Sequence, residues 1–377
     1  MSRFLSKRGP VISAWAAVSP FGIGREAFRD GLLAGHGTAA PVSGPEDRAA
    51  GPGEMACVVP GFEIREVLGK KGTRSMDRLT AVAVATVGQL VAHADAEAES
   101  GPGRALVLGT TTGSAQSMMD FTRSSLTGDK PFFVDPARFP NTVMNCAAGQ
   151  AAIWYQLKGP NVTIGGGRAA GLLALNYARR LQRTARARSV LCGGAEEYSP
   201  ARAWLQRHSR ADDEAGAVLG EGCAMLLVEP AGPDCAERPG LAEVLAIEFG
   251  VFAVPGDVRT VLSSALRRAF ASAGADPAQL WAVAPGGVPG GLGVQEHAAI
   301  QDVLGDAAPR SIPCTVLIGD TAAAAATFQL VSALAFAENE PSARARLALV
   351  TAVDRDGVVG CALLRIPGGA GAGAGKG

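Results

Sequence analysis

Short apolar runs alternate along the chain with longer stretches in which apolar residues recur every three or four positions. The short runs predict buried strands, and the periodic stretches predict helices with one buried stripe. In the first half, strands are expected at residues 10–18, 105–109, 161–164, 188–194 and 220–229. Helices are expected there at residues 25–33, 76–95, 114–126 and 169–181. For the helix at 76–95, the expected buried stripe is Leu79, Val82, Ala83, Val87 and Leu90.

The second half repeats this alternation. Strands are expected at residues 241–248, 280–284, 311–318, 346–353 and 358–365, and helices at 258–274 and 322–338. Two halves with the same rhythm predict an α/β protein built by duplication, with five layers in the order α/β/α/β/α. We expect an N-terminal half at 1–231 and a C-terminal half at 240–367, separated by a Pro- and Gly-containing link, and a flexible Gly/Ala tail at 368–377.

Two helices, at residues 169–181 and 322–336, are apolar on nearly all sides and rich in small residues. Helices of this kind belong in the middle of a fold, so we expect the two to pack side by side. Each follows a strand and a Gly-containing turn. This arrangement places Arg168 and Asp320 at the two helix starts.

The turn before the first of these helices contains three glycines, Gly165–Gly167, which permit a steep change of direction. Arg168 follows them at the positive end of the helix, a position that favours an anion. A cation there is disfavoured by roughly 0.3–1 kcal/mol, and by more if it is desolvated. We therefore expect Arg168 to have a carboxylate partner.

Composition excludes several classes of protein. The 35 Lys and Arg residues balance the 35 Asp and Glu residues, so net charge predicts no affinity for nucleic acid or membranes. The Arg-rich residues 179–188 are interpreted as a solvated helix end, with an acidic carrier protein as the partner if they form a patch. Seven cysteines without a C-x-x-C pair indicate reduced thiols. With no metal cluster, leader or membrane-spanning run in the pattern, we expect a cytoplasmic protein without metal.

The segment GPNVTIGGGRAAGLLAL (residues 159–175) resembles the nucleophile segment of the β-ketoacyl synthases, condensing enzymes of the thiolase fold. In that family GPN-V-T-I-x-x-x-Cys-x-x-G opens the central helix. Arg168 occupies the position of the cysteine. The resemblance implies a thiolase-like, five-layered fold made of two pseudo-repeated halves, in which residues 132–153 match the loop and helix where two subunits meet.

The other catalytic positions of the family are also substituted. Condensation requires a thiolate to hold the acyl chain and two imidazoles to polarise the malonyl carbonyl, which the family supplies from Cys, H-G-T-G-T and K-S-x-x-G-H-T. Matching these motifs places Gly286 and Asp320 at the two histidines and Thr315 at the lysine. His297 lies on an apparent amphipathic helix and is expected at the surface. No catalytic residue is therefore assigned, and the condensing chemistry is expected to be lost.

A full-length but degenerate copy resembles the chain-length factor, or ketosynthase-β, of type II polyketide synthases. The resemblance implies a noncatalytic subunit that pairs with an active ketosynthase and limits chain length, while the phosphopantetheine of an acyl carrier protein delivers the acyl chain to the partner. No cofactor of its own is implied. The candidate tunnel and interface residues are Gln116, Met119, Asp120, Arg123 and Phe133. Residues 139–150 look closer to polyene-making than to aromatic systems. The usual chain-length factor has glutamine, not arginine, at the turn.

Because Arg168 and Asp320 replace residues that face each other in active family members, we expect a buried salt bridge that plugs the vestigial site. Glu221 is the alternative anion. Residues 204–217 are shorter than the corresponding family segment, so a surface excursion above this site is expected to be missing.

Three other readings stay open at this stage. GGGRAA also fits the dinucleotide fingerprint, with Glu196 as the acidic residue, although the spacing is poor. An unusual decarboxylase or acyltransferase could use Asp320, Asp213 or Glu214 on a carrier-bound acyl group, since a buried carboxylate with a raised pKa can act as a base. A homodimeric scaffold without a partner is the third.

Overall fold

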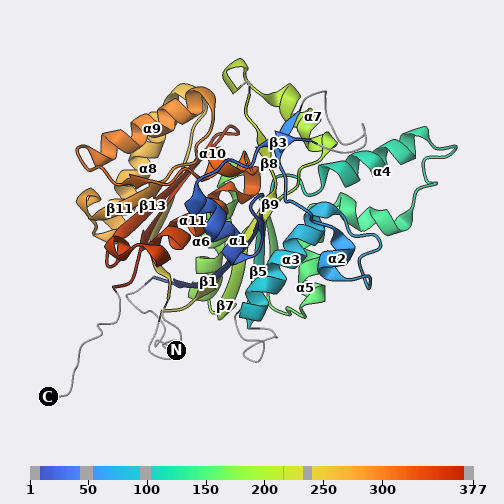
Figure 1. The fold of residues 1–377 in the computed structure, drawn as a ribbon, viewed down its shortest axis with the longest axis horizontal. Coiled ribbons are helices and arrows are strands. Elements are labelled where there is room, and N and C mark those ends of the chain that lie inside the picture. Colours follow the sequence, from blue (N-terminus) through green and yellow to red (C-terminus); the bar gives the residue numbers. More distant parts are fainter. Residues whose placement is uncertain (1–8, 43–53, 94–102, 215, 232–239, 369–377) are drawn as a thin grey trace.

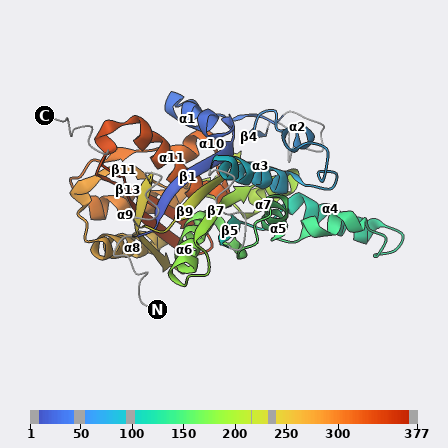
Figure 2. The same cartoon turned by 90° about the horizontal axis from the view of Figure 1, so that it is seen from below.

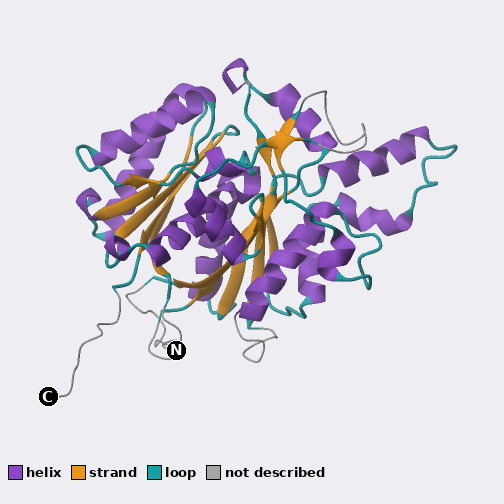
Figure 3. Ribbon diagram, viewed as in Figure 1, coloured by secondary structure: helices purple, strands orange, loops and turns teal. Residues whose placement is uncertain are grey.

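The computed structural model describes residues 9–42, 54–93, 103–214, 216–231 and 240–368. The expected link at residues 232–239 and the tail from residue 369 onward lie outside these ranges. Figure 1 shows the described chain as alternating layers of helices and strands, and Figure 3 shows that the strands form two groups on either side of central helices.

Ten strands form one continuous path in the order β12-β11-β13-β14-β10-β1-β9-β7-β5-β6. The N-terminal group is β1 (Val11–Ser19), β5 (Arg104–Thr110), β6 (Asn161–Gly165), β7 (Ser189–Glu196) and β9 (Gly222–Glu229). The C-terminal group is β10 (Ala242–Val251), β11 (Leu280–Ala284), β12 (Arg310–Ser311), β13 (Leu347–Asp354) and β14 (Val358–Arg365). Only two residue pairs join the groups, where β1 meets β10. The two half-sheets can therefore diverge around the central helices.

The described residues form eleven α-helices, which Figure 1 labels α1 to α11. Their bounds are α1 Arg25–Ala34, α2 Ile64–Leu68, α3 Arg78–His93, α4 Ala115–Thr127, α5 Cys146–Trp154, α6 Ala170–Arg183, α7 Pro200–Ser209, α8 Val258–Ala273, α9 Gly290–Leu304, α10 Cys314–Ile318 and α11 Ala325–Asn339. Short strands β3 (Ala40–Pro41), β4 (Met55–Cys57) and β8 (Leu219–Gly220) form a small second sheet, and β2 (Gly22–Ile23) pairs with β1.

Three buried apolar clusters fill the spaces between the layers. The first surrounds α6 and α11, between the two half-sheets. The second packs α3 and α5 on the other face of the N-terminal half-sheet, and the third packs α8 and α9 on the other face of the C-terminal half-sheet. The layer order is therefore α3/α5, strands, α6/α11, strands, α8/α9, as Figure 1 shows. This is the five-layered arrangement that the duplication predicts.

The central helices approach each other closely, which confirms the expectation that they pack side by side. A Cβ atom added at Gly171 of α6 would lie 2.4 Å from Oγ1 of Thr327 in α11, too close for any real side chain. Residues 325–336 of α11 are all buried. Small residues on both helices therefore allow the backbones to meet in the middle of the molecule.

The structure corrects three local expectations. Residues 314–318 form helix α10 instead of the end of a strand, because Pro313 cannot donate a ladder hydrogen bond and suits a helix start. Helix α3 is buried on nearly all sides from residue 79 to 87, since it packs against the strands, α2 and α5. Strand β6 is not buried. It forms the edge of the sheet, pairs with β5 alone among the described strands, and is half-exposed.

Candidate functional site

The turn between β6 and α6 has the steep geometry that its glycines predict. The short 3-10 helix η3 (Gly167–Ala169) connects the two elements, and Gly167 has a φ of +48°. A Cβ atom at Gly167 would lie 2.0 Å from Oδ2 of Asp354, so a side chain there is excluded. The backbone N–H of Arg168 donates to that same carboxylate oxygen at 2.5 Å. The helix start therefore already binds an anion, and that anion belongs to β13.

Arg168 and Asp320 form the buried ion pair that their positions predict. Nη2 of Arg168 lies 2.5 Å from Oδ2 of Asp320, and Nε donates to Oδ1 at 3.3 Å, which makes the contact two-pronged. The two residues are 7% and 6% exposed. Oδ1 of Asp320 also accepts from the backbone N–H of Ala322, at the start of the second central helix. One contact thus joins the starts of both central helices.

The charges of this pair reinforce each other. Burial on its own would raise the pKa of Asp320, but the Arg168 guanidinium holds that pKa well below its usual range. Burial opposes the charge of Arg168, yet Asp320, Asp354 and Glu214 together raise the pKa of the guanidinium. Both groups are therefore ionised at neutral pH, and Asp320 has no proton to give and little tendency to take one.

Glu221, the alternative partner for Arg168, binds a different arginine. Its carboxylate is fully buried and accepts from Nε of Arg78 at 2.8 Å and from Nη2 at 2.5 Å. The backbone N–H groups of Val59 and Tyr198 donate to the same carboxylate. Glu221 therefore fixes α3 to the ends of β4 and β7. The alternative was wrong because sequence spacing cannot show that Arg78 reaches this carboxylate from another layer.

Gly286 and Thr315 lie beside a buried glutamate that sequence reasoning missed. Oε1 of Glu296 accepts from the N–H of Gly286 at 2.8 Å and from the hydroxyl of Thr351, and a Cβ atom at Gly286 would lie 2.9 Å from Oε1. Thr315 donates its hydroxyl to the Gly286 carbonyl at 2.8 Å. Burial raises the pKa of Glu296. The glutamate thus fills the space that a side chain at position 286 would need.

A signal for Glu296 was present in the sequence. It precedes Ala299 and Ile300 by three and four positions, and both are buried on α9, so all three share the inward stripe of that helix. His297, one position on, is exposed, as expected for a surface residue.

The remaining carboxylates proposed as possible bases are already engaged. Glu214 is buried and lies 2.8 Å from Nη2 of Arg355. Asp213 is exposed and accepts from the N–H of Gly291 at 2.6 Å. With Asp320 paired to Arg168, none of the three candidates is a buried carboxylate without a partner. General-base chemistry therefore finds no support among them.

The glycine-rich turn also lacks the arrangement that a dinucleotide needs. A pyrophosphate binds the free N–H groups at a helix start. Here the Arg168 N–H is occupied by Asp354. Glu196, the acidic residue of that reading, is buried, accepts from Thr111 and from the N–H of Ala323, and therefore faces the protein interior.

The tunnel candidates lie on an arm that projects from the layered body in both Figure 1 and Figure 2. The arm is α4 with its return through the 3-10 helix η2 (Pro136–Thr142), and the two pack together. Gln116 donates its amide to Asp120 at 2.9 Å and accepts from the N–H of Ala201 at 3.0 Å. Met119 is 39% exposed, Phe133 is 61% exposed, and Arg123 is exposed. The structure thus gathers all five candidates on one projection.

Two carboxyl groups, one buried and one half-buried, lie at the base of this arm. Glu197 follows β7, is 2% exposed, and accepts from the hydroxyl of Ser114 and the N–H of Gln116. Asp77, just before α3, accepts from the hydroxyl of Ser117. Burial, and after it the negative charge of Asp77, raises the pKa of Glu197 to about 7, from an ordinary value of 4.5.

This raised pKa predicts a pH dependence of stability. Between pH 4.5 and about 7 the unfolded chain releases the Glu197 proton while the folded chain keeps it, so the contribution of Glu197 falls as pH rises. The variant Glu197→Gln cannot lose a proton, so it should be more stable than the wild type near pH 8, and the difference should shrink toward pH 4.5. Urea unfolding across this range measures it, with the exposed Glu26→Gln as control. A constant difference at all pH values would contradict the assignment.

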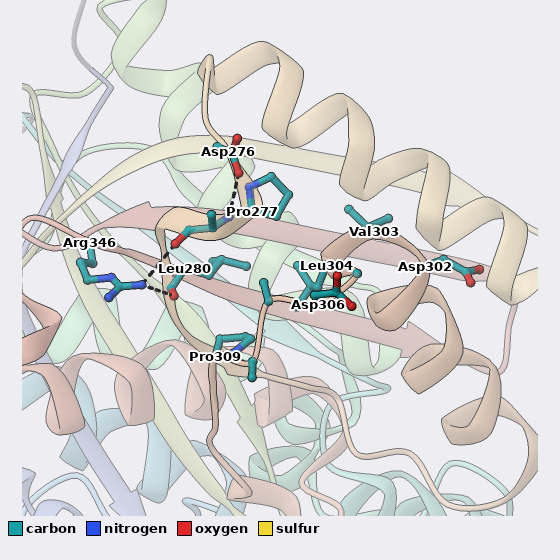
Figure 4. A pocket seen from close by; sticks show the side chains of 13 residues that line it. Asp276, Pro277, Leu280, Asp302, Val303, Leu304, Asp306, Pro309 and Arg346 are labelled. Carbon is teal, nitrogen blue, oxygen red and sulfur yellow. Dashed lines mark hydrogen bonds between the residues drawn. The ribbon is translucent and has the colours of Figure 1, made fainter.

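A surface hollow of 630 Å³ lies elsewhere, on the C-terminal half (Figure 4). Three of its charged side chains have partners: Arg346 donates to the carbonyls of Ala278 and Leu280, Asp276 accepts from the Ala278 N–H, and Asp302 pairs with Arg259. No cluster of three or more potential metal ligands occurs among the described residues. Within the same residues, none of the helices is long and apolar enough to cross a bilayer.

The five layers, with paired central helices and a strand–turn–helix elbow at their start, define a thiolase-like ketosynthase scaffold. The family model described as "Beta-ketoacyl synthase, N-terminal domain" matches residues 10–232, more than half of the chain. The chain belongs to the β-ketoacyl synthase family.

Individual relatives refine this assignment. The solved structure of "the ishigamide ketosynthase/chain length factor" has a chain that is 44% identical, with a TM-score of 0.88 and coverage of 96% of this chain and 100% of that one. The granaticin polyketide putative beta-ketoacyl synthase 2 of Streptomyces violaceoruber is 29% identical over 82% of this chain and 78% of its own length. The 3-oxoacyl-[acyl-carrier-protein] synthase 2 of Coxiella burnetii is 29% identical over 60% of this chain, which spans 58% of that protein.

A second solved structure shares the fold. It is a type II polyketide synthase acyl carrier protein in complex with its ketosynthase bound to the hexaketide, and its matching chain is 18% identical, with a TM-score of 0.77 over 95% of this chain.

Proposed function

We propose that this chain is a noncatalytic chain-length-factor subunit, which forms a heterodimer with an active ketosynthase and shapes the tunnel for a growing polyketide. The observation that carries the proposal is the buried Arg168–Asp320 pair, which occupies two family catalytic positions with inert, mutually neutralised charges. The 44% identity to a ketosynthase/chain-length-factor structure supports the same role.

An unpaired sheet edge and exposed apolar side chains support association with a partner. Among the described strands, β6 has a neighbour on one side only, and a sheet edge with its N–H and C=O groups favours pairing with another chain. The neighbouring segment carries large exposed apolar residues: Phe132, Phe133, Phe139, Val143, Met144 and Ile153. Such a patch is typical of a protein interface. We call β6 with these residues the association face.

The partner supplies the chemistry in this proposal. The active ketosynthase holds the nucleophile, and an acyl carrier protein delivers the acyl chain to it on phosphopantetheine, so this chain needs no cofactor of its own. The six cysteines of the described residues are free thiols, which supports a reducing, cytoplasmic setting.

Co-expression with a Cys-His-His ketosynthase and a carrier protein tests the proposal. We expect a one-to-one complex that makes a product of defined length, whereas the isolated chain should neither decarboxylate malonyl-carrier protein nor extend an acyl thioester. Activity of the isolated chain would instead favour the alternative, an unusual decarboxylase or acyltransferase. A stable homodimer that does not bind the ketosynthase would favour the third alternative, a homodimeric scaffold without a partner.

The arm gives a prediction about product length. Met119→Ala and Phe133→Ala should each lengthen the product, and Met119→Trp should shorten it, because side-chain bulk here limits how far the chain extends. Removing a few methylene groups from an apolar tunnel changes discrimination by about tenfold, so we expect about a tenfold change in the ratio of longer to wild-type product. Mass spectrometry of the products measures it. Val294→Ala, an exposed valine on α9, is the control. If product length is unchanged in all three variants, Met119 and Phe133 do not limit chain length.

We also propose a polyene-type product, on the basis of residues 139–150. The absorption spectrum of the product decides this, since conjugated polyenes and aromatic polyketides absorb differently.

A further inference from the structure

The arm is attached to the body at both of its ends. At the return end, the amide of Asn141 in η2 donates to the carbonyl of Ser75 at 2.6 Å. At the first turn of α4, Ser114, Gln116 and Ser117 form hydrogen bonds with the body, and their partners are Glu197 after β7, Asp77 before α3 and Ala201 of α7. Beyond this turn, the side-chain hydrogen bonds of α4 stay within the helix or reach its own return segment, as from Ser125 to the Pro131 carbonyl. Figures 1 and 2 both show the rest of the helix projecting away from the body. The direction of the arm therefore depends on a few contacts at its base.

Glu197 is the central group of that base. Both of its carboxyl oxygens lie 3.1 Å from Oγ of Ser114, the N-cap residue of α4, and Oε1 accepts from the N–H of Gln116 at 3.3 Å. The hydroxyl oxygen of Ser114 in turn accepts from the N–H of Ser117. Glu197 thus holds the cap itself, and through it the first turn.

The backbone at Glu197 is held in place by contacts with the interior of the protein. The residue before it, Glu196, ends β7 and is fixed in the interior by Thr111 and by the N–H of Ala323, at the start of the central helix pair. The backbone carbonyl of Glu197 accepts from Nη1 of Arg202 at 2.8 Å. The charged groups that face Glu197 are Asp77, Glu196 and Arg78. A small change in the length of the Glu197 side chain would therefore move α4 and not the sheet.

We propose that Glu197 is a positioning residue for the arm, which sets the orientation of α4 by its reach to Ser114 and Gln116 and so determines product length. The effect of Glu197 on product length rests on the proposed function. Met119 lies one turn beyond Gln116, so a tilt at the base of α4 directly displaces this side chain, which is proposed to limit product length.

Two conservative variants distinguish the effect of side-chain length at Glu197 from the effect of its charge. Glu197→Gln keeps the reach and loses the charge, whereas Glu197→Asp keeps the charge and is shorter by one methylene. Positioning by reach predicts that the Gln variant retains the wild-type product distribution. In the Asp variant the ratio of wild-type to altered lengths should change by about fivefold, the population shift expected when one ordinary hydrogen bond is lost. If Glu197 only stabilised the fold, the product distribution would not change in the Asp variant while staying the same in the Gln variant.

Two measurements test the two halves independently. Hydrogen exchange of the isolated chain should show faster exchange of the α4 amides in Glu197→Asp, by about fivefold, with α8 unchanged. Product lengths from the ketosynthase complex should then shift in the Asp variant and not in the Gln variant. Asp276→Ala is the matched control, because Asp276 caps a helical turn on the opposite half of the molecule.

The outcomes are distinguishable from failure of the proposed function. Unchanged α4 exchange in Glu197→Asp overturns the positioning role, whatever the partner does. Faster exchange with an unchanged product distribution overturns the link to product length. If the wild-type complex does not form at all, the proposed function fails, and the exchange measurement still decides whether Glu197 anchors the arm.

Discussion

Arg168→Ala should lower the free energy of unfolding of this chain by roughly 3–5 kcal/mol, the range measured when one partner of a buried ion pair is removed. Asp320, which is 6% exposed, would lose the partner of its ion pair, because its carboxylate then keeps one backbone N–H and the more distant charges of Arg202 and Arg210. The loss should be largest near neutral pH and should shrink in acid, where protonation of Asp320 removes the unpaired charge. Urea unfolding of the isolated chain measures this.

Two controls show that the pairing itself causes the loss. The double variant Arg168→Ala with Asp320→Ala removes both charges and should be more stable than Arg168→Ala alone, since no buried charge is then left unpaired. Arg259→Ala breaks an exposed pair with Asp302 and should change stability little. If Arg168→Ala unfolds at the same urea concentration as the wild type, the pair does not hold the central helices together.

The overall architecture was predictable because it depends on features that a sequence states directly. Alternating apolar runs and periodic stretches reveal strands and helices, and their repetition reveals the duplication. The pairing of Arg168 with Asp320 was predictable for a related reason. Both residues precede helices whose inward faces are rich in small apolar residues, and such faces can pack closely in the centre of the fold.

The errors concern features that depend on contacts between layers. Strand β6 has the apolar, β-branched composition of a buried strand, yet it is an edge among the described strands, and the order of strands in a sheet depends on contacts that a single sequence does not reveal. Helix α3 shows one apolar stripe, but α5 covers its other side. Glu221 has a partner, Arg78, that comes from a distant segment, so spacing along the chain gave no means of choosing between the two candidate anions for Arg168.

The association face yields the second large expected effect. Ile153→Asp should weaken binding to the partner ketosynthase by about a hundredfold or more, because burying an unpaired carboxylate at the centre of an interface costs several kcal/mol. Ile153 is 67% exposed on α5, a helix that packs against β6, so the substitution changes the surface without disturbing the core of this subunit. Analytical ultracentrifugation or co-purification of the two subunits measures the loss.

Val294→Asp is the matched control for this experiment, since Val294 is 68% exposed and lies on α9, in the outermost layer of the opposite half. Both variants add one carboxylate to an exposed β-branched residue, so any general effect of charge on solubility or stability affects them alike. Only Ile153→Asp should abolish the complex if the partner binds beside β6. Equal loss in both variants would indicate destabilisation of the subunit. Loss confined to Val294→Asp would place the partner on the C-terminal half, and the free edge of β6 would then need another explanation.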